Sequence, residues 1–159
     1  MAGALTIDEA FGHWFAGFVD GEGCFFVRRN IVRYDGDSYV TYGCSLSMTA
    51  RDDDLPMLEW IRDRLEMGSI SRRHQGPSQG TRGNPSACLY IGAKADVLCL
   101  VEIFDRFPLR SKKRRDYEVW RRAVLEWHRE RGAKTRGRDW SVMAELHEEL
   151  KAVRRYAAA

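Results

Sequence analysis

Glu22 is the residue best placed to do chemistry, because it stands between Gly21 and Gly23 where a helix-like pattern gives way to a strand-like one. Glycine allows close backbone approach and leaves a carbonyl oxygen accessible. A carboxylate beside a free carbonyl, here that of Gly21, is a donor set that suits Mg²⁺, which keeps several waters when few protein groups bind it. One glutamate is too little for a complete metal site, so the sequence predicts that further oxygen ligands come from elsewhere.

A second feature with chemical potential is the run from Lys112 to Arg115, the densest positive stretch of the chain. Such runs are often solvated helix faces. This one stands at a predicted helix start, where cations oppose the helix dipole. Nearby phosphates would remove that penalty, so Lys113 and Arg114 are candidate phosphate contacts.

Hydrophobic periodicity predicts the elements that position these groups. Thr6 followed by Glu9 fits a capping box and predicts a helix from about Ile7 to Asp20. Large apolar residues share one arc of this helix, and the opposite arc has Gly12, His13, Ala16, Gly17 and Asp20. Glycine costs about 1 kcal/mol relative to alanine in a helix, so we expect another backbone to approach this small face. For Asp20 itself, a hydrogen bond to local backbone is the favoured role.

Alternation with period two predicts two strands between Cys24 and Met48, joined by a turn at Asp35 to Asp37. One face of the second strand is apolar and the other has small hydrogen-bonding groups. Arg29 and Arg33 leave the register of the first strand open.

The remaining chain predicts a helix at Leu55–Glu66 and a second strand pair at Ser69–His74 and Ala87–Ile91. Three more helices are predicted at Ala93–Phe107, Ser111–Arg131 and Asp139–Tyr156. This order predicts an α+β fold of the form αββαββα, with a four-stranded antiparallel sheet, helices on one face and an extra C-terminal helix. The other face of the sheet would be open to a large partner. The polar segment 75–86 is expected to be a mobile arm. We expect residues 1–131 to form the core and 132–159 to be a linker and a helix packed on it.

Composition limits the classes of protein that need to be considered. The chain has 159 residues, 44% of them hydrophobic, and a net charge of +3. That size predicts one domain, and the mild charge does not by itself indicate a nucleic-acid binder. The four cysteines show no metal-ligand spacing. Neither a signal peptide nor an apolar span of membrane length is visible, so we expect a soluble, intracellular protein without a membrane partner.

The nine residues from Phe15 to Gly23 resemble the motif that names the LAGLIDADG homing endonucleases, with Glu22 at its second acidic position. The resemblance covers most of the first 125 residues. Single-motif members form homodimers through their motif helices, and the acidic position binds a divalent metal. One motif therefore implies a homodimer, with Gly12, His13, Ala16, Gly17 and Asp20 at the interface.

Two further segments invite comparison with this family. Phe107 to Tyr117 resembles its closing basic motif, which implies a catalytic role for Lys112, with Lys113 as the register alternative. Ala50 stands where a glutamine commonly helps to order solvent, and Asp54 lies near the place of a basic group in some relatives. These two departures from the family pattern imply that solvent in the active site is ordered differently here or that activity is weaker.

The resemblance implies a site-specific endodeoxyribonuclease that hydrolyses double-stranded DNA at a long pseudo-palindromic target. Two Glu22 carboxylates, Gly21 carbonyls and DNA phosphates would bind Mg²⁺, a site that Mn²⁺ or Ca²⁺ could also occupy. The open sheet face would read the major groove through Arg28, Asn30, Tyr34, Tyr39, Thr41, Ser45, Ser47, Ser71 and Arg73. The alternatives are a maturase that binds intron RNA and a non-cleaving DNA-binding regulator.

Overall fold

The computed structural model describes residues 6–73, 84–129 and 137–155. The elements are α1 (Glu9–Glu22), β1 (Gly23–Tyr34), β2 (Asp37–Arg51), the 3-10 helix η1 (Asp52–Asp54), α2 (Leu55–Leu65), β3 (Ser69–Arg73), β4 (Ser86–Ile91), α3 (Lys94–Arg106), α4 (Lys113–His128) and α5 (Ser141–Arg154). The predicted α+β fold is confirmed, although most of the predicted mobile arm and linker lies outside the described residues. No helix in these three ranges has the length and apolar character needed to cross a membrane.

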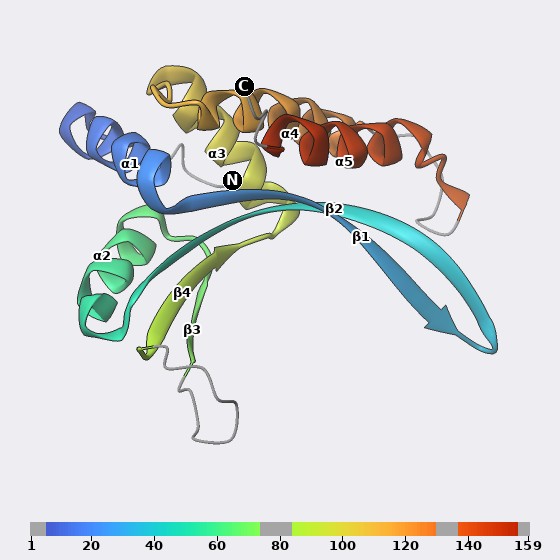
Figure 1. The fold of residues 1–159 in the computed structure, drawn as a ribbon, viewed down its shortest axis with the longest axis horizontal. Coiled ribbons are helices and arrows are strands. Elements are labelled where there is room, and N and C mark those ends of the chain that lie inside the picture. The colour runs from blue at the N-terminus through green and yellow to red at the C-terminus, as the bar shows by residue number, and fades with distance from the viewer. Residues whose placement is uncertain (1–5, 74–83, 130–136, 156–159) are drawn as a thin grey trace.

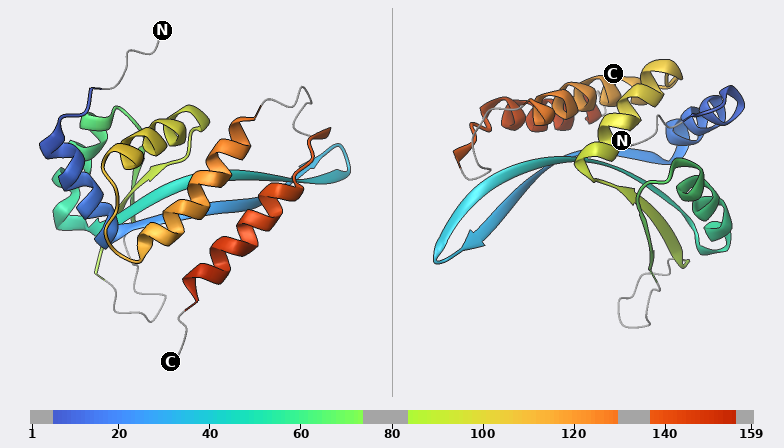
Figure 2. Two further views of the ribbon diagram at one scale, coloured as in Figure 1. Left: turned by 90° about the horizontal axis from the view of Figure 1, so that it is seen from above. Right: turned by 180° about the vertical axis from the view of Figure 1, so that it is seen from behind.

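The four strands form one antiparallel sheet in the order β1-β2-β4-β3. Helices α1, α3, α4 and α5 lie on one side of the sheet, and the long β1–β2 hairpin curves away from them (Figure 1). Seen from above, α4 and α5 lie across β1 and β2 (Figure 2). The fully buried Leu46, Met48 and Leu89 belong to the helix-covered face. The other face is the concave underside of the arch.

The hairpin turn fixes the register of this long strand pair. Asp35 and Gly36 have φ values of 50° and 78°, which is the left-handed geometry of a tight hairpin turn that suits the twist of the strands. Arg28 then pairs with Gly43, and Arg29 pairs with Tyr42. Tyr42 is buried under the helices, and directly paired residues point to the same face. Arg28 therefore belongs to the open face, and the register left open by the sequence is settled.

The start of α1 differs from the prediction. Asp8, not Thr6, is the N-cap, because its Oδ1 accepts a hydrogen bond of 2.9 Å from the amide of Phe11. Asp8 also forms an ion pair with Arg64 of α2. An acid that both caps one helix and pairs with its neighbour fixes where α1 begins.

The prediction that the small residues of α1 form a face open to a partner is wrong for Gly12 and Ala16, because both residues are buried within the chain. A Cβ on Gly12 would lie 2.3 Å from the ring of Phe107. Gly12 is small because an aromatic ring packs directly on the α1 backbone. Gly17 differs, since a Cβ there would meet nothing within 4 Å.

Helix α5 covers the outer edge of β1, which is the edge strand of the sheet. The Nδ1 of His147 donates to the carbonyl of Val27 at 2.5 Å, and Arg154 donates to the carbonyl of Phe25. Edge strands present unpaired backbone groups, and covering them prevents unwanted strand pairing. Two side chains of α5 therefore satisfy carbonyls that the sheet leaves unpaired.

The different surroundings of Gly12 and Gly17 generate a prediction about stability. Gly12→Ala should destabilise the fold by about 1–2 kcal/mol, because the new methyl group overlaps a ring that has no room to move. Gly17→Ala should instead stabilise a single chain by about 0.4–1 kcal/mol, because alanine restricts the unfolded chain and meets no clash. Urea unfolding at low protein concentration measures both. Equal effects at the two positions would contradict the packing of Phe107 on Gly12.

Candidate functional site

Glu22 is the last residue of α1, and β1 begins at the next residue. The amide of Gly23 donates to the carbonyl of Val19 and closes the helix. A Cβ on Gly23 would lie 2.6 Å from Cγ1 and 2.8 Å from the carbonyl oxygen of Val19. Only glycine fits this close approach, and the junction leaves the Glu22 backbone little freedom.

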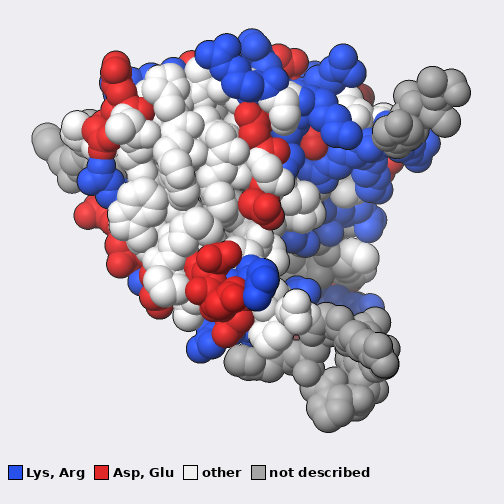
Figure 3. All heavy atoms as spheres, turned by 60° about the vertical axis from the view of Figure 1, so that its left-hand side comes forward, with Lys and Arg blue, Asp and Glu red and all other residues white. Residues whose placement is uncertain are grey.

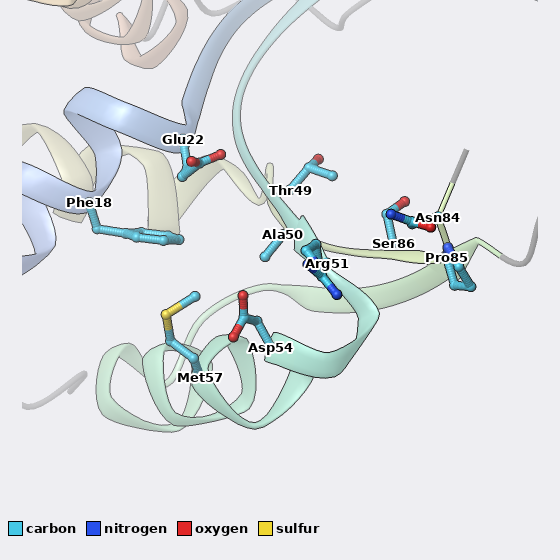
Figure 4. Close-up of a pocket in the computed structure, with 10 residues that line it drawn as sticks. All are labelled: Phe18, Glu22, Thr49, Ala50, Arg51, Asp54, Met57, Asn84, Pro85 and Ser86. Atoms are coloured by element: carbon cyan, nitrogen blue, oxygen red, sulfur yellow. The ribbon is translucent and has the colours of Figure 1, made fainter. Parts of the chain in front are cut away.

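The Glu22 side chain lines a pocket of about 430 Å³ between α1, the end of β2, the start of α2 and the start of β4 (Figure 4). Its other lining residues are Phe18, Thr49, Ala50, Arg51, Asp54, Met57, Asn84, Pro85 and Ser86. No hydrogen bond or ion pair joins Glu22 to another residue of the part of the chain that is described here. The carboxylate is therefore available to a ligand in the pocket.

The donor atoms of this pocket fit a hard divalent cation in part. Glu22 and Asp54 offer carboxylate oxygens and Thr49 a hydroxyl, and oxygen ligands are those that Mg²⁺ prefers. Arg51 is the arginine of this lining, and its guanidinium is bound by Asp53. Among the described residues, no group of three or more His, Cys, Asp or Glu side chains is arranged so that it could hold a metal ion. The described residues of a single chain thus provide part of a metal site.

Lys112 and Lys113 line a different cavity, of about 600 Å³, between the end of α1, the start of α4 and the end of α5. Gly21 also borders this second cavity. The Nζ of Lys113 donates to the carbonyl of Val19 at 3.2 Å, at the negative end of the α1 dipole. Lys112 is exposed and precedes the first turn of α4. Lys113, the register alternative, is thus tied to the motif helix by this hydrogen bond.

Asp20 fastens the end of α1 to the segment before α4. Its carboxylate accepts hydrogen bonds from the amide of Arg110 at 2.8 Å, and from the amide and hydroxyl of Ser111 at 3.1 and 2.7 Å. Partial burial alone would raise the pKa of Asp20, but these hydrogen bonds and Lys113 bring the pKa below its ordinary value. The side chain thus has a structural role, although its partners are Arg110 and Ser111 and not the local backbone that the sequence predicted. A place for Asp20 at a dimer interface stays a prediction.

The nine sheet residues predicted to contact DNA share the open face by strand register. Arg28, Asn30 and Tyr34 are exposed there, as are Ser71 and Arg73. Ser45 is only 1% exposed and Thr41 is also buried, so these two need correction as contacts. Neighbouring side chains cover such short groups. Tyr39 and Ser47 are half-buried.

The geometry also separates Arg114 from the sheet. Its guanidinium lies 3.5 Å from Glu118 on the same helix, α4, which is on the helix-covered side of the sheet (Figure 1). A phosphate contact through Arg114 stays a prediction.

Sequence analysis missed two aromatic residues of the open face. Phe26 lies beneath the guanidinium of Arg28, which is 4.3 Å from its ring centre. Tyr90 pairs with Ser47 and Ser69 and is partly exposed. The alternation of buried Leu89 and Ile91 around Tyr90 was the signal that could have found it.

Next to the pocket, α1 and α2 present an aromatic patch, defined by Trp14, Phe18 and Trp60, of which Phe18 also lines the pocket. Trp14 is 40% and Trp60 47% exposed. The Trp14 ring stacks on Phe18 with centroids 5.4 Å apart and meets Trp60 edge-on at 5.0 Å. On the face that includes α1 and α2, uncharged residues cover a broad area while Lys and Arg gather to one side (Figure 3). Exposed apolar patches of this kind mark interaction surfaces.

Comparison with known proteins identifies a family model and sequence relatives that this chain matches. A family model described as LAGLIDADG endonuclease matches residues 15–124. The probable intron-encoded endonuclease Cox1-I1b of Schizosaccharomyces pombe is 24% identical over 73% of this chain and 27% of its own length. An uncharacterized 50.9 kDa protein in ND4 intron 1 of Podospora anserina is 29% identical over 70% of this chain and 23% of its own. The chain thus spans about a quarter of the length of these relatives.

Solved structures share the fold. The LAGLIDADG meganuclease I-AabMI, bound to uncleaved DNA, is 27% identical with a TM-score of 0.54 over 72% of this chain and 35% of its own. The homing endonuclease I-TnaI is 23% identical, with a TM-score of 0.66 over 89% and 94%. The archaeal intron-encoded I-Vdi141I, complexed with DNA, is 17% identical with a TM-score of 0.70 over 95% and 89%. The last two likenesses support the fold alone.

The Asp20 hydrogen bonds generate a prediction about pH. Asp20→Asn should lower the free energy of unfolding by about 1–2 kcal/mol at neutral pH, because hydrogen bonds to a charged acceptor are lost. The folded-state pKa of Asp20 is below its ordinary 3.8, so this stabilisation is present above 3.8 and disappears as the pH falls through the folded value. Urea unfolding of both forms between pH 7 and pH 2.5 measures the difference. A gap that stays constant in acid would contradict the role of the charge.

Proposed function

This chain belongs to the LAGLIDADG endonuclease family, and from that premise we propose that it is a site-specific endonuclease that hydrolyses double-stranded DNA. The single observation that supports the proposal most is the placement of Glu22. This carboxylate ends the motif helix, has no partner among the described residues and lines an open pocket. A carboxylate without a partner among the described residues adds little to the stability of the fold and is available for a reaction.

In the proposed mechanism, Glu22 and the Gly21 carbonyl would hold Mg²⁺ together with phosphate oxygens of the DNA, and the cation would supply a water of lowered pKa and charge for the leaving oxygen. Glu22 is held in a fixed position for this role, since α1 passes into β1 without a loop. Lys113, or Lys112 in the alternative register, borders the neighbouring cavity together with Gly21. From there it would add positive charge on the side of α1 opposite the Glu22 pocket, toward the charge that develops in the transition state.

Specificity is proposed to come from the open sheet face. The 12 residues of β1 and 15 of β2 extend along the concave side, and about ten strand residues at 3.3 Å each span roughly ten base pairs. Arg28 and Asn30 are exposed there and are suited to guanine and adenine edges. A relative of this fold, I-AabMI, was solved bound to DNA.

We also propose that two copies of the chain act together. The described part of one chain provides only part of a metal site, and α1 exposes His13, Trp14 and Gly17 on its outer side. Gly17 has open space around it, so a second α1 helix could approach closely. A two-fold dimer reads two inverted half-sites, which accounts for a long pseudo-palindromic target.

The decisive experiment is cleavage of DNA by wild-type chain and by Glu22→Gln. Selection from a randomised duplex library first yields a bound site, and cleavage of that site is then followed with Mg²⁺ and with EDTA. We expect Glu22→Gln to reduce the rate by at least about a hundredfold while binding is retained, because the change removes the charge and keeps the size. Glu118→Gln, on the outer side of α4, is the matched control and should cleave normally. Full activity of Glu22→Gln would refute the assignment of this residue.

The homodimer is tested by substitution at Gly17. Gly17→Leu should prevent close approach of two α1 helices and give a monomer, whereas Gly17→Ala should still associate. An added Cβ at this position meets nothing within 4 Å in the single chain, and unfolding curves of both variants check that each one folds. Sedimentation velocity with and without target DNA distinguishes the species. A wild-type chain that stays monomeric in both conditions would eliminate the paired arrangement of Glu22.

A further inference from the structure

We propose that Asp54 is a second carboxylate of the Glu22 pocket and holds the water shell of the divalent cation bound there. This inference rests on the proposed function of the pocket. Asp54 comes from the start of α2, and Glu22 comes from the end of α1. The two acids lie on different walls of the same cavity (Figure 4).

The first argument comes from the partners of three successive acids. Asp52 accepts two hydrogen bonds from Arg72, at 2.7 and 2.6 Å. Asp53 accepts two from Arg51, at 3.1 and 2.8 Å. Asp54 has no such partner within residues 6–73, 84–129 and 137–155. Its two neighbours have a structural use, and Asp54 is left facing the pocket.

The second argument is that Asp54 stands at the N-terminus of α2 but does not cap this helix with its side chain. It is the N-cap residue of α2, yet its side chain makes no capping hydrogen bond. Aspartate at an N-cap ordinarily accepts a hydrogen bond from an amide of the first turn and stabilises the helix. The Asp54 carboxylate lines the Glu22 pocket instead.

The third argument is electrostatic. Glu22 and Asp54 give the pocket two carboxylates, and the guanidinium of Arg51 in the lining is bound by Asp53. Ala50 adds no polar side chain. No other described residue of the lining is positively charged, so a divalent cation would supply the charge that balances the two acids.

The size of the pocket leaves room for a hydrated cation. A volume of about 430 Å³ corresponds to roughly a dozen waters at about 30 Å³ each. Mg²⁺ gives up its waters reluctantly and is often bound by one or two carboxylates. With Glu22 on one wall as the ligand, Asp54 on the other wall would accept hydrogen bonds from the waters of the cation. It would thus be a positioning residue for that water shell.

Terbium luminescence tests the inference without measuring cleavage. Tb³⁺ takes oxygen ligands like those of Mg²⁺ and emits when a nearby indole transfers energy. Trp14 stacks on Phe18, which lines the pocket, so the full chain contains its own sensitiser. Tb³⁺ is titrated into the chain, and Mg²⁺ is then used to displace it.

We expect Asp54→Asn to weaken Tb³⁺ binding by about tenfold or more, as loss of a partner that holds coordinated groups does. Glu22→Gln should weaken it at least as much, and Asp54→Glu should restore part of the affinity. The matched control is Asp63→Asn, which removes the same charge from α2 at a residue that lies outside the pocket lining and is paired with Arg62. That variant should bind Tb³⁺ as the wild-type chain does.

Three outcomes would overturn the inference. They are wild-type affinity in Asp54→Asn, equal weakening in Asp63→Asn, which would indicate a general charge effect, and no sensitised emission from the wild-type chain. Unfolding curves of each variant exclude a folding defect. If the variants behave as expected but the chain cleaves no DNA, then the proposed function fails while the metal pocket stands.

Discussion

The structure depends on the passage of α1 into β1 at Gly23, where no loop separates helix from strand. The Gly23 backbone lies so close to Val19 that any Cβ would overlap its carbonyl oxygen. Three other constraints meet within one turn: Asp20 holds the segment before α4, Lys113 donates to the Val19 carbonyl, and Glu22 enters the pocket. Close packing at one glycine therefore fixes the position of an acid and a lysine that come from distant parts of the sequence.

Small residues in α1 serve two different purposes, and the structure separates them. Gly12 makes room for a ring of the same chain, which contributes to stability, whereas Gly17 leaves space that nothing in the described chain fills. Glycine in an exposed helix interior is unfavourable by about 1 kcal/mol relative to alanine. Retaining it beside the exposed Trp14 is unfavourable for an isolated chain and reasonable for one that associates. The stability of this helix and its proposed surface for a second copy thus depend on different glycines of the same helix.

Local patterns predicted the elements well, because alternation and turn residues act over a few positions. The hairpin turn at Asp35, the opening of α2 near Pro56 and the junction at Glu22 are all of this kind. The failures arose from contacts between residues far apart in sequence. Asp8 caps α1 and also pairs with Arg64, and Gly12 is buried by Phe107. Neither partner is visible in a short window, and neither is the burial of Ser45 in the middle of the sheet.

The pocket illustrates what a local departure from a family pattern does to a site. Ala50 adds no polar side chain to the lining, and Glu22 and Asp54 give it two carboxylates, so under the proposed function the pocket would repel a phosphate until a cation is bound. Binding of the cation and binding of DNA would then favour each other, and by linkage each would raise the affinity of the other by the same factor. A basic group in the place of Asp54 would attract DNA without metal and weaken this coupling. Under this proposal, the acids of the pocket would make the presence of the cation a condition for bringing a phosphate close to Glu22.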